Sequence, residues 1–380
     1  MLSSEAILGY RKHYPGLEGK SYFNFGGQGP MANETIEAIF ESYRYVQKEG
    51  PFSGKLFEWL DHEIKDTRSA FARLFGGQPH CYAITQNATE GVNIVLWGID
   101  WQAGDELLLS DCEHPGVVNV AETVASRFSL SLKYFPISGQ SEEELLAALD
   151  RAITKKTRVF AFSNVLWNTG EHIKTDKIVA LCHERNVQVL VDGAQSAGVL
   201  PVDLVDSGID YYAFTCHKWL CGPEGTGGLY ISEERLSGLL PTFVGWRYLM
   251  PADMKVNASR FEVATSPFPL LAGLRQAIQL HDIACAAERF EMILANARYF
   301  RELLAARGFK SIAAEAATGL VSFSLGGKDH HQALKEIESK GFYMRTIPKP
   351  DALRASLHYF STREEIEALV EILSEVVRSA

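Results

Sequence analysis

The chain has 380 residues and a mass of 42.2 kDa, with 46% hydrophobic and 22% charged residues. This composition is typical of a globular protein and excludes a disordered, collagenous or coiled-coil chain. Because Lys and Arg total 37 against 47 Asp and Glu, the formal net charge is −10, which argues against binding to nucleic acid or to an anionic membrane surface.

Export and membrane signals are not visible in the sequence. Residues 1–12 lack a basic region followed by an apolar one. No apolar run approaches the roughly 18 residues that a membrane-spanning helix needs. The six cysteines are scattered without a C-x-x-C pair, which predicts reduced and mostly buried thiols. Together these features predict a cytoplasmic protein.

Strands and helices alternate through the first two thirds of the chain. The predicted elements, in order, are a strand at 105–110, a helix at 141–153, a strand at 158–162, a helix at about 176–185 and strands at 187–191 and 211–214. Ser141 and Glu144 open the first helix at capping-box spacing. Since the strands are apolar on both faces, they indicate a parallel sheet covered by helices, in which ligands bind at the carboxyl ends of the strands.

The pattern changes near residue 250. Residues 250–270 contain prolines and little periodicity, and they predict a connection between two domains. The elements predicted after it are a long helix at 270–307, strands around 319–324 and 355–360, and a closing helix that opens at a Thr362/Glu365 capping box. We therefore expect a large domain over 15–255 and a smaller α+β domain that consists of 256–380 together with residues 1–14.

Several common functional signatures are missing: the G-x-x-x-x-G-K-[ST] phosphate loop, the G-x-G-x-x-G fingerprint, the G-x-S-x-G elbow and the H-E-x-x-H zinc helix. The adjacent His330 and His331 lie in a polar run. Without Cys or Asp ligands at useful spacing, they predict a solvated helix start rather than a metal site. We therefore expect no metal.

Two of the predicted strands end in residues that carry chemistry. One ends in Asp192-Gly-Ala-Gln, and another ends in Thr215-Cys-His-Lys218, followed by a glycine-rich turn. A carboxylate and a lysine at neighbouring strand ends are consistent with a plain buried ion pair. Alternatively, they anchor pyridoxal 5'-phosphate (PLP), because the carboxylate keeps the ring nitrogen protonated and the lysine holds the aldehyde as a Schiff base. Thr215, His217 and the glycine-rich turn favour the second interpretation.

These motifs, together with Gly222-Pro-Glu-Gly-Thr-Gly, resemble the signature of the class V PLP-dependent enzymes of fold type I. This family includes cysteine desulfurases, selenocysteine lyases, isopenicillin-N-epimerase-like proteins and cyst(e)ine C–S lyases, and the likeness covers nearly the whole chain. The resemblance implies an α/β fold with a mostly parallel seven-stranded sheet, a smaller α+β C-terminal domain, PLP as the cofactor and a homodimer with shared active sites.

The resemblance also implies roles for individual residues. Lys218 would carry the cofactor, Asp192 would face the ring nitrogen and His114, in Glu113-His-Pro-Gly, would stack on the ring. The further cofactor contacts would be Ala88, Thr89, Asn164, Gln195 (to the phenolic oxygen), Thr215, His217 and, from the other subunit, Thr265. Residues 85–93 also predict an anion site by themselves, because they follow a short strand and open a helix, where free N–H groups and the helix dipole attract phosphate.

Two arginines near the C-terminus are the predicted substrate-binding residues. Arg354 matches the family arginine that binds the substrate α-carboxylate, for which a guanidinium fork is well suited. Arg345 is either a surface arginine or a second carboxylate clamp, which would suit a dicarboxylic amino acid such as cystine. The spacing of the two resembles that of the cyst(e)ine C–S lyases. Asn168 is a further candidate for contact with substrate.

The cysteines bear on the reaction. A cysteine desulfurase needs a thiolate on a mobile loop shortly before the carboxylate-binding arginine, and residues 286–380 contain no cysteine. The main hypothesis is therefore a PLP-dependent carbon–sulfur lyase that converts L-cystine or L-cysteine to pyruvate, ammonia and a persulfide or sulfide. An acceptor protein could take up this sulfur, for example for iron–sulfur clusters. The alternatives are a desulfurase or selenocysteine lyase giving alanine, an epimerase of the isopenicillin N type, and a regulator or scaffold without activity.

Overall fold

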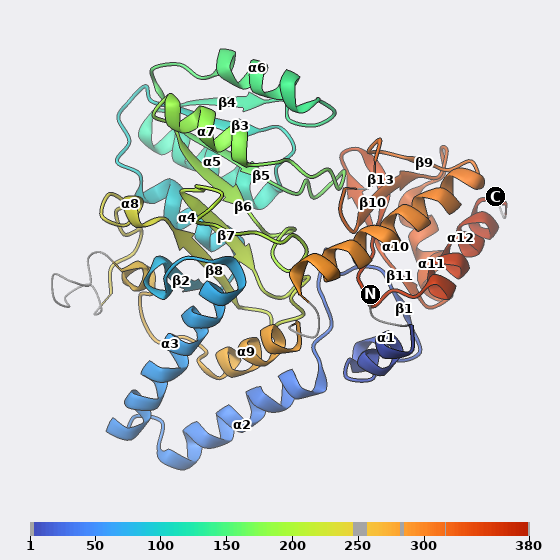
Figure 1. Ribbon diagram of the computed structural model, residues 1–380, viewed down its shortest axis with the longest axis horizontal. Helices are drawn as coiled ribbons and strands as arrows, with labels where there is room; N and C mark the ends of the chain where they lie inside the picture. The colour runs from blue at the N-terminus through green and yellow to red at the C-terminus, as the bar shows by residue number, and fades with distance from the viewer. Residues whose placement is uncertain (1–3, 246–256, 282–284, 316, 379–380) are drawn as a thin grey trace.

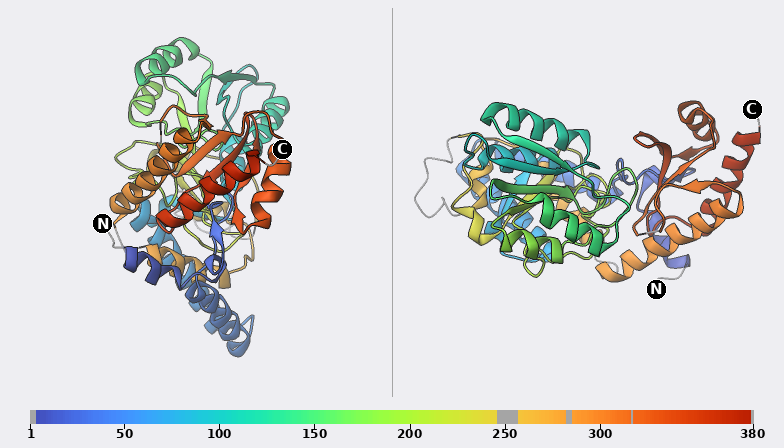
Figure 2. Two further views of the ribbon diagram at one scale, coloured as in Figure 1. Left: turned by 90° about the vertical axis from the view of Figure 1, so that its right-hand side faces the viewer. Right: turned by 90° about the horizontal axis from the view of Figure 1, so that it is seen from above.

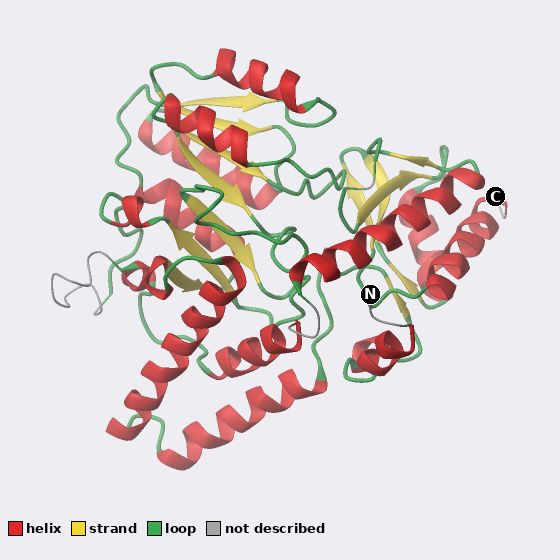
Figure 3. Ribbon diagram, in the orientation of Figure 1, coloured by secondary structure: helices red, strands yellow, loops and turns green. Residues whose placement is uncertain are grey.

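The computed structural model describes residues 4–245, 257–281, 285–315 and 317–378. A large part built around one extended sheet and a smaller part built around the C-terminal sheet lie side by side, with the long helix α10 (Ala286–Ala306) running along the smaller part (Figures 1 and 3). None of the described helices combines the length and the apolar character that crossing a membrane would require.

The large sheet has seven strands and is mostly parallel, as predicted. In spatial order they are β2 (Tyr82–Thr85), β8 (Gly227–Ile231), β7 (Tyr211–Thr215), β6 (Gln188–Asp192), β5 (Thr157–Ser163), β3 (Glu106–Ser110) and β4 (Ser131–Phe135). Only β8 among them runs antiparallel to its neighbours. Helices lie on both sides of the sheet (Figure 2), which explains why its central strands are apolar throughout.

The helices α6 (Glu142–Ala152) and α7 (Asp176–Glu184) confirm the two helices predicted between the strands, and α4 (Ala88–Gly98) begins within the predicted anion site at 85–93. The large part also contains α5 (Pro115–Phe128) and α8 (Glu233–Leu236). Ser141 and Glu144 form the predicted capping box at the start of α6. The helices α2 (Asn33–Glu49) and α3 (Gly54–Phe75) extend away from the sheet, and α9 (Pro269–His281) packs against both (Figure 1).

The smaller part has a four-stranded antiparallel sheet. Its order is β12 (Arg345–Pro348), β13 (Asp351–Ser356), β10 (Leu320–Ser324) and β9 (Lys310–Ser311). The other elements are α1 (Ser4–Arg11), α11 (His330–Ser339), α12 (Arg363–Arg378) and a parallel pair of β1 (Ser21–Tyr22) and β11 (Phe342–Tyr343). Thr362 and Glu365 exchange the predicted capping hydrogen bonds before α12. Apolar residues of α10, α12 and the sheet form the core of this part.

Four expectations need correction or stay open. The helix predicted at 270–307 is two helices, α9 and α10, and the predicted strand at 355–360 lies earlier, at β13. His331 is exposed at the start of α11, as predicted, but His330 is buried. The Nδ1 of His330 lies 3.0 Å from Asp351 Oδ1, and its Nε2 accepts a hydrogen bond from the Leu325 amide. Residues 246–256, which include part of the predicted connection, lie outside the described residues.

The predicted domain boundary at 255/256 remains a proposal. Two contacts cross this boundary, since β1 pairs with β11 and α9 packs against α2 and α3.

The predicted state of the cysteines is confirmed: all six are free, four of them are buried, Cys112 is half-buried and Cys285 is exposed.

Candidate active site

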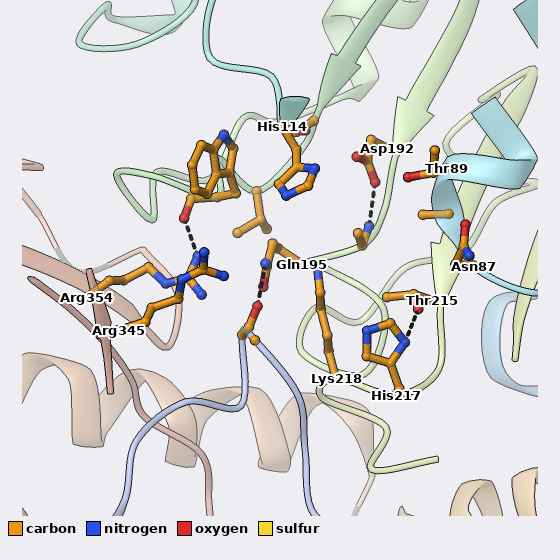
Figure 4. Close-up of a pocket in the computed structure, with 17 residues that line it drawn as sticks. Asn87, Thr89, His114, Asp192, Gln195, Thr215, His217, Lys218, Arg345 and Arg354 are labelled. Carbon is orange, nitrogen blue, oxygen red and sulfur yellow. Dashed lines mark hydrogen bonds between the residues drawn. The ribbon is translucent and has the colours of Figure 1, made fainter. Parts of the chain in front are cut away.

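A pocket of about 330 Å³ lies at the carboxyl ends of the parallel strands (Figure 4). The strands β3, β5, β6 and β7 all end at this edge, and segments from the smaller part close it. The lining residues are Gly26, Gly27, Asn87, Ala88, Thr89, His114, Ser163, Val165, Trp167, Asp192, Ala194, Gln195, Thr215, His217, Lys218, Arg345 and Arg354. The structure therefore brings most of the predicted site residues together.

Lys218 and Asp192 are the charged pair at the base of the pocket. Burial lowers the pKa of Lys218 to about 8, against the opposing pull of the Asp192 carboxylate. Asp192 is buried at the end of β6, and its Oδ1 accepts a hydrogen bond from the Ala194 amide (2.8 Å). Burial raises the pKa of Asp192, and the Lys218 charge only partly offsets this. A carboxylate in this position is stabilised by a cationic partner.

The start of α4 forms an anion site. Asn87 caps this helix, with its Oδ1 accepting from the Glu90 amide (2.9 Å). The N–H groups of Ala88 and Thr89, at the pocket wall, lie in the first turn, where the helix supplies no acceptor. On the same side of the pocket, beside Asn87, a hydrogen bond of 2.6 Å joins Thr215 at the end of β7 to His217 (Figure 4).

His114 lies at the start of α5 and is exposed to the pocket. Its Nδ1 accepts a hydrogen bond from the Gly116 amide (3.1 Å), so it caps the helix as well as lining the pocket. Desolvation and the charges of Lys218 and the two arginines lower its pKa to about 4. His114 is therefore a neutral imidazole at pH 7. Its ring meets the Trp167 indole edge to face, at 5.3 Å between centroids.

The two predicted substrate arginines face each other. Arg345 on β12 and Arg354 on β13 are direct partners across the antiparallel pair. Arg354 is fully buried, and its Nη1 donates to the Trp167 carbonyl (2.6 Å). Within the described chain, its Nε and Nη2 are buried without a hydrogen-bond partner. Burial and the charge of Arg345 lower the pKa of Arg354 to about 9.

Such an arrangement favours an anionic ligand. Two like charges directly opposite each other in a sheet are destabilising, and buried donors are normally paired. Gly26 leaves room for the Arg354 guanidinium, because a Cβ at Gly26 would lie 3.1 Å from Nη2. Two guanidinium groups with unused donors can accept an anionic group such as a carboxylate at this end of the pocket.

Glu113 is a buried carboxyl to which the sequence analysis gave no role. It accepts hydrogen bonds from Ser110 Oγ (2.5 Å), Ser163 N (2.7 Å) and Ser163 Oγ (2.7 Å), and so ties the ends of β3 and β5 together. Burial, followed by the nearby Asp192 charge, raises its pKa to about 7. Because it precedes His114 directly, Glu113 fixes the turn that presents this imidazole to the pocket.

Three predicted residues lie outside this pocket. Asn164 is buried and lines a neighbouring cavity with His172 and Lys174. Asn168 donates from its Nδ2 to the Lys349 carbonyl (3.0 Å) and does not line the pocket. Thr265 is exposed and lines a separate hollow.

Sequence reasoning missed the pocket residues Trp167 and Asn87, and also Glu113, which precedes His114 and does not itself line the pocket. The Asn before the helix start was a usable signal for Asn87, since Asn is a favoured N-cap. Trp167 offers no such signal, because only the tertiary fold brings it against His114 and Arg354.

Outside the pocket, His80, Cys81 and Glu233 have potential metal-ligand atoms within 4.8 Å of one another. The prediction that the protein uses no metal stays untested.

Comparison with known sequences decides the family. The sequence profile described as "Aminotransferase class-V" matches residues 31–369. The chain belongs to this family. It is 29% identical to the isopenicillin N epimerase of Streptomyces clavuligerus, over 92% of this chain and 93% of that protein. It is 27% identical to a cysteine desulfurase of Haloferax volcanii, over 82% of this chain and 78% of that protein.

Solved structures include similar proteins. A complex of the cystine C–S lyase C-DES with its reaction product cysteine persulfide is 41% identical over 95% of this chain and 99% of that chain, with a TM-score of 0.90. A variant of C-DES with glycine covalently linked to its PLP cofactor is 40% identical over 96% of this chain and 99% of that chain, with a TM-score of 0.92. The fold is thus that of the fold type I PLP enzymes, as the sequence predicted.

The pocket fits PLP on its own chemistry. A lysine amine with a pKa lowered to about 8 suits a Schiff base, and a protonated ring nitrogen would stabilise the charge of the buried Asp192, which Lys218 offsets only in part. The start of α4 offers unused N–H groups for a phosphate. The chain is therefore a PLP-dependent enzyme of the class V family.

Proposed function

We propose that the protein is a carbon–sulfur lyase that catalyses β-elimination, with L-cystine as the preferred substrate and L-cysteine as a weaker one. The paired arginines Arg345 and Arg354 carry this proposal. A substrate with a carboxylate at each end would use the unpaired donors of Arg354 and relieve the repulsion between the two guanidinium groups. The likeness to the cystine C–S lyase C-DES supports the same substrate class.

Each charged residue of the pocket has a task in this reaction. When bound, PLP supplies an electron sink for the negative charge that develops at the substrate Cα. Arg354 binds the α-carboxylate and Arg345 the distal one. Lys218, whose pKa of about 8 leaves part of its amine free near neutral pH, removes the Cα proton. Asp192 would stabilise the protonated form of the cofactor ring nitrogen.

The bond that breaks joins the β-carbon to sulfur. The sulfur leaves with the bonding electron pair, as cysteine persulfide from cystine or as sulfide from cysteine. One water molecule then enters, and the remaining three-carbon unit leaves as pyruvate and ammonia. His114 is neutral, so it adds no positive charge beside Lys218 and can pack flat against an aromatic ring.

The pocket supports elimination over sulfur transfer to the enzyme. No cysteine stands among the described residues that line it. Cys112 is the half-buried thiol closest in sequence to His114, and desolvation with the charge of Asp111 raises its pKa to about 12. A thiol of this kind is a poor nucleophile near pH 7. A desulfurase, which would yield alanine, is therefore disfavoured.

Epimerisation is the second candidate, and the similarity to isopenicillin N epimerase favours it. It shares the removal of the Cα proton but returns a proton to the opposite face. Such a reaction needs an acid on that side of the substrate. His114, with a pKa lowered to about 4, holds no spare proton at pH 7, which argues against it as that acid.

The test is a product analysis of the PLP-loaded protein with L-cystine, L-cysteine and L-alanine. Pyruvate, alanine, sulfide and the D-amino acid are quantified separately. The proposal predicts pyruvate from cystine at the highest kcat/KM, less from cysteine, and no alanine from either. Alanine as the main product would establish a desulfurase, and a D-amino acid without pyruvate would establish an epimerase.

We further propose that the protein works as a homodimer in the cytoplasm. Thr265 is exposed and lies outside its own pocket, which agrees with a contact to the cofactor phosphate of a second copy. The six free cysteines agree with a reducing compartment. Sedimentation analysis of wild type and of Thr265→Ala, with PLP affinity measured on both, tests the shared site. A monomer with full PLP affinity would contradict it.

A further inference from the structure

Gln195 lies in the pocket wall between two fixed groups. It is 5% exposed, and its Oε1 accepts a hydrogen bond from the Trp219 indole Nε1 (2.9 Å). Its Nε2 donates to the Gly26 carbonyl oxygen (2.9 Å), as the dashed line at Gln195 in Figure 4 marks. The proposed reaction assigns no task to Trp219.

These two contacts determine which end of the amide faces which neighbour. An indole N–H can only donate and a backbone carbonyl can only accept. A flipped Gln195 would set donor against donor at Trp219 and acceptor against acceptor at Gly26. The amide nitrogen carries two hydrogens, and Gly26 uses one. Since Gln195 lines the pocket, its second N–H is available to an acceptor bound there.

The indole itself is held by residues outside the large sheet. Trp219 is fully buried and stacks on His358 (5.9 Å between centroids, 14° between planes) and on Phe25 (6.5 Å, 21°). A Cβ at Gly319 would lie 2.8 Å from the indole Cη2, so glycine there leaves the space that the ring fills. The position of Trp219 is therefore set by the N-terminal segment and the smaller part of the chain.

We propose that Trp219 is a positioning residue, which holds Gln195 so that its amide nitrogen donates to the phenolic oxygen of the bound cofactor. This inference rests on the proposed function, because it takes PLP as the acceptor in the pocket. A donor N–H stabilises the phenolate form of such an oxygen. This hydrogen bond therefore lowers the pKa of the proton that the phenolic oxygen shares with the neighbouring lysine nitrogen. The pH midpoint of the visible absorbance change is lowered by the same amount.

The experiment is a pH titration of the visible absorbance band of the PLP-loaded protein. Trp219→Phe removes the N–H donor and keeps an aromatic ring in the stack. We expect its midpoint to rise by about one pH unit, a tenfold change in the proton equilibrium. In steady-state kinetics, kcat falls severalfold while KM changes little. A merely structural role would lower stability without moving the midpoint.

Trp101→Phe is the matched control. Trp101 is also buried and its Nε1 also donates a hydrogen bond, here to the backbone carbonyl of Leu96 (2.7 Å), but Trp101 does not line the pocket. We expect this variant to lose stability and to keep the wild-type midpoint. A midpoint for Trp219→Phe that matches both wild type and Trp101→Phe overturns the proposal.

A second variant separates Gln195 from other effects of the indole. In a Gln195→Leu background, Trp219→Phe should add no further shift, because the two residues act through one contact. An equal shift in both backgrounds overturns the proposal. If Trp219→Phe does not fold, the contact is tested by NMR instead, by comparing the indole N–H signals of ¹⁵N-labelled wild type and Gln195→Leu. The Trp219 signal should move upfield in the variant, and an unmoved signal refutes the contact.

The same titration distinguishes this inference from the proposed function. A wild-type protein without a visible band in the presence of PLP would overturn both. A wild-type band with cystine turnover, combined with an unshifted Trp219→Phe variant, would overturn only the role of Trp219.

Discussion

Replacing Arg345 by Met removes one charge of the arginine pair and keeps an unbranched apolar side chain in place of the arginine stem. Arg345 is half-buried and lines the pocket, and its Nε donates to the carbonyl of its neighbour Thr346 (3.3 Å). A hydrogen bond to a charged group contributes about 1.5–3 kcal/mol. The variant should therefore lose roughly 10- to 100-fold in kcat/KM for L-cystine.

L-Cysteine lacks the distal carboxylate, so its kcat/KM should change by less than about threefold. The same variant should be slightly more stable without ligand. Arg345 and Arg354 are direct cross-strand partners, and such like-charged pairs cost about 0.2–1 kcal/mol. Removing Arg345 also removes the charge that helps to lower the pKa of Arg354.

The assay measures pyruvate formation from both substrates and thermal unfolding of the ligand-free protein. Arg301→Met is the control, because Arg301 is a partly buried arginine of the smaller part that donates to the carbonyls of Ala313 and Ala314 and does not line the pocket. It should lose stability and keep the cystine-to-cysteine ratio. Equal losses on cystine and cysteine in Arg345→Met would refute the second clamp.

Three further variants test other parts of the site. Lys218→Ala should abolish both turnover and the covalent cofactor band, and a variant with full turnover would contradict its role. Cys112→Ala should keep at least about half of the pyruvate formation, whereas a loss of tenfold or more would point to a cysteine-dependent reaction. The pKa of Glu113 is about 7 in the folded protein, above its value in the unfolded chain, so the folded state binds this proton more tightly. The free energy of unfolding of the cofactor-free protein should therefore fall by about 3 kcal/mol as the pH rises from about 4.5 to 7. Glu113→Gln should flatten this slope in pH-dependent urea unfolding, and an unchanged slope would contradict the buried acid.

The strand ends were predictable because burial on both faces leaves a strong pattern. Phe162 and Val191 are almost fully buried in the centre of the sheet, so the sequences of their strands are continuous apolar runs that end in polar residues. The capping box at Ser141 is a local signal and was equally visible. Long-range features left no such pattern.

The errors have a common physical origin in tertiary contacts. His358 and Phe360 look like strand residues, but they pack in an aromatic cluster with Phe25 after β13 has ended. The role of Asn164 stays a prediction: Val165 forms a bridge with His172 at this point, and Asn164 lines the adjacent cavity.

The outcome for Arg345 shows what the structure adds. The sequence left a surface arginine and a second clamp as alternatives. The register of β12 against β13 sets Arg345 opposite Arg354 and at the pocket wall, which removes the surface alternative. A register is fixed by the whole sheet, so no local motif could have decided it.

The most direct test of the account is a mass balance for L-cystine consumed by the PLP-loaded wild-type protein, with the sulfur product trapped by an alkylating agent. The account predicts one pyruvate, one ammonia and one trapped cysteine persulfide for each cystine consumed. Consumption of cystine with alanine or D-cystine in place of pyruvate, or without persulfide, would contradict it.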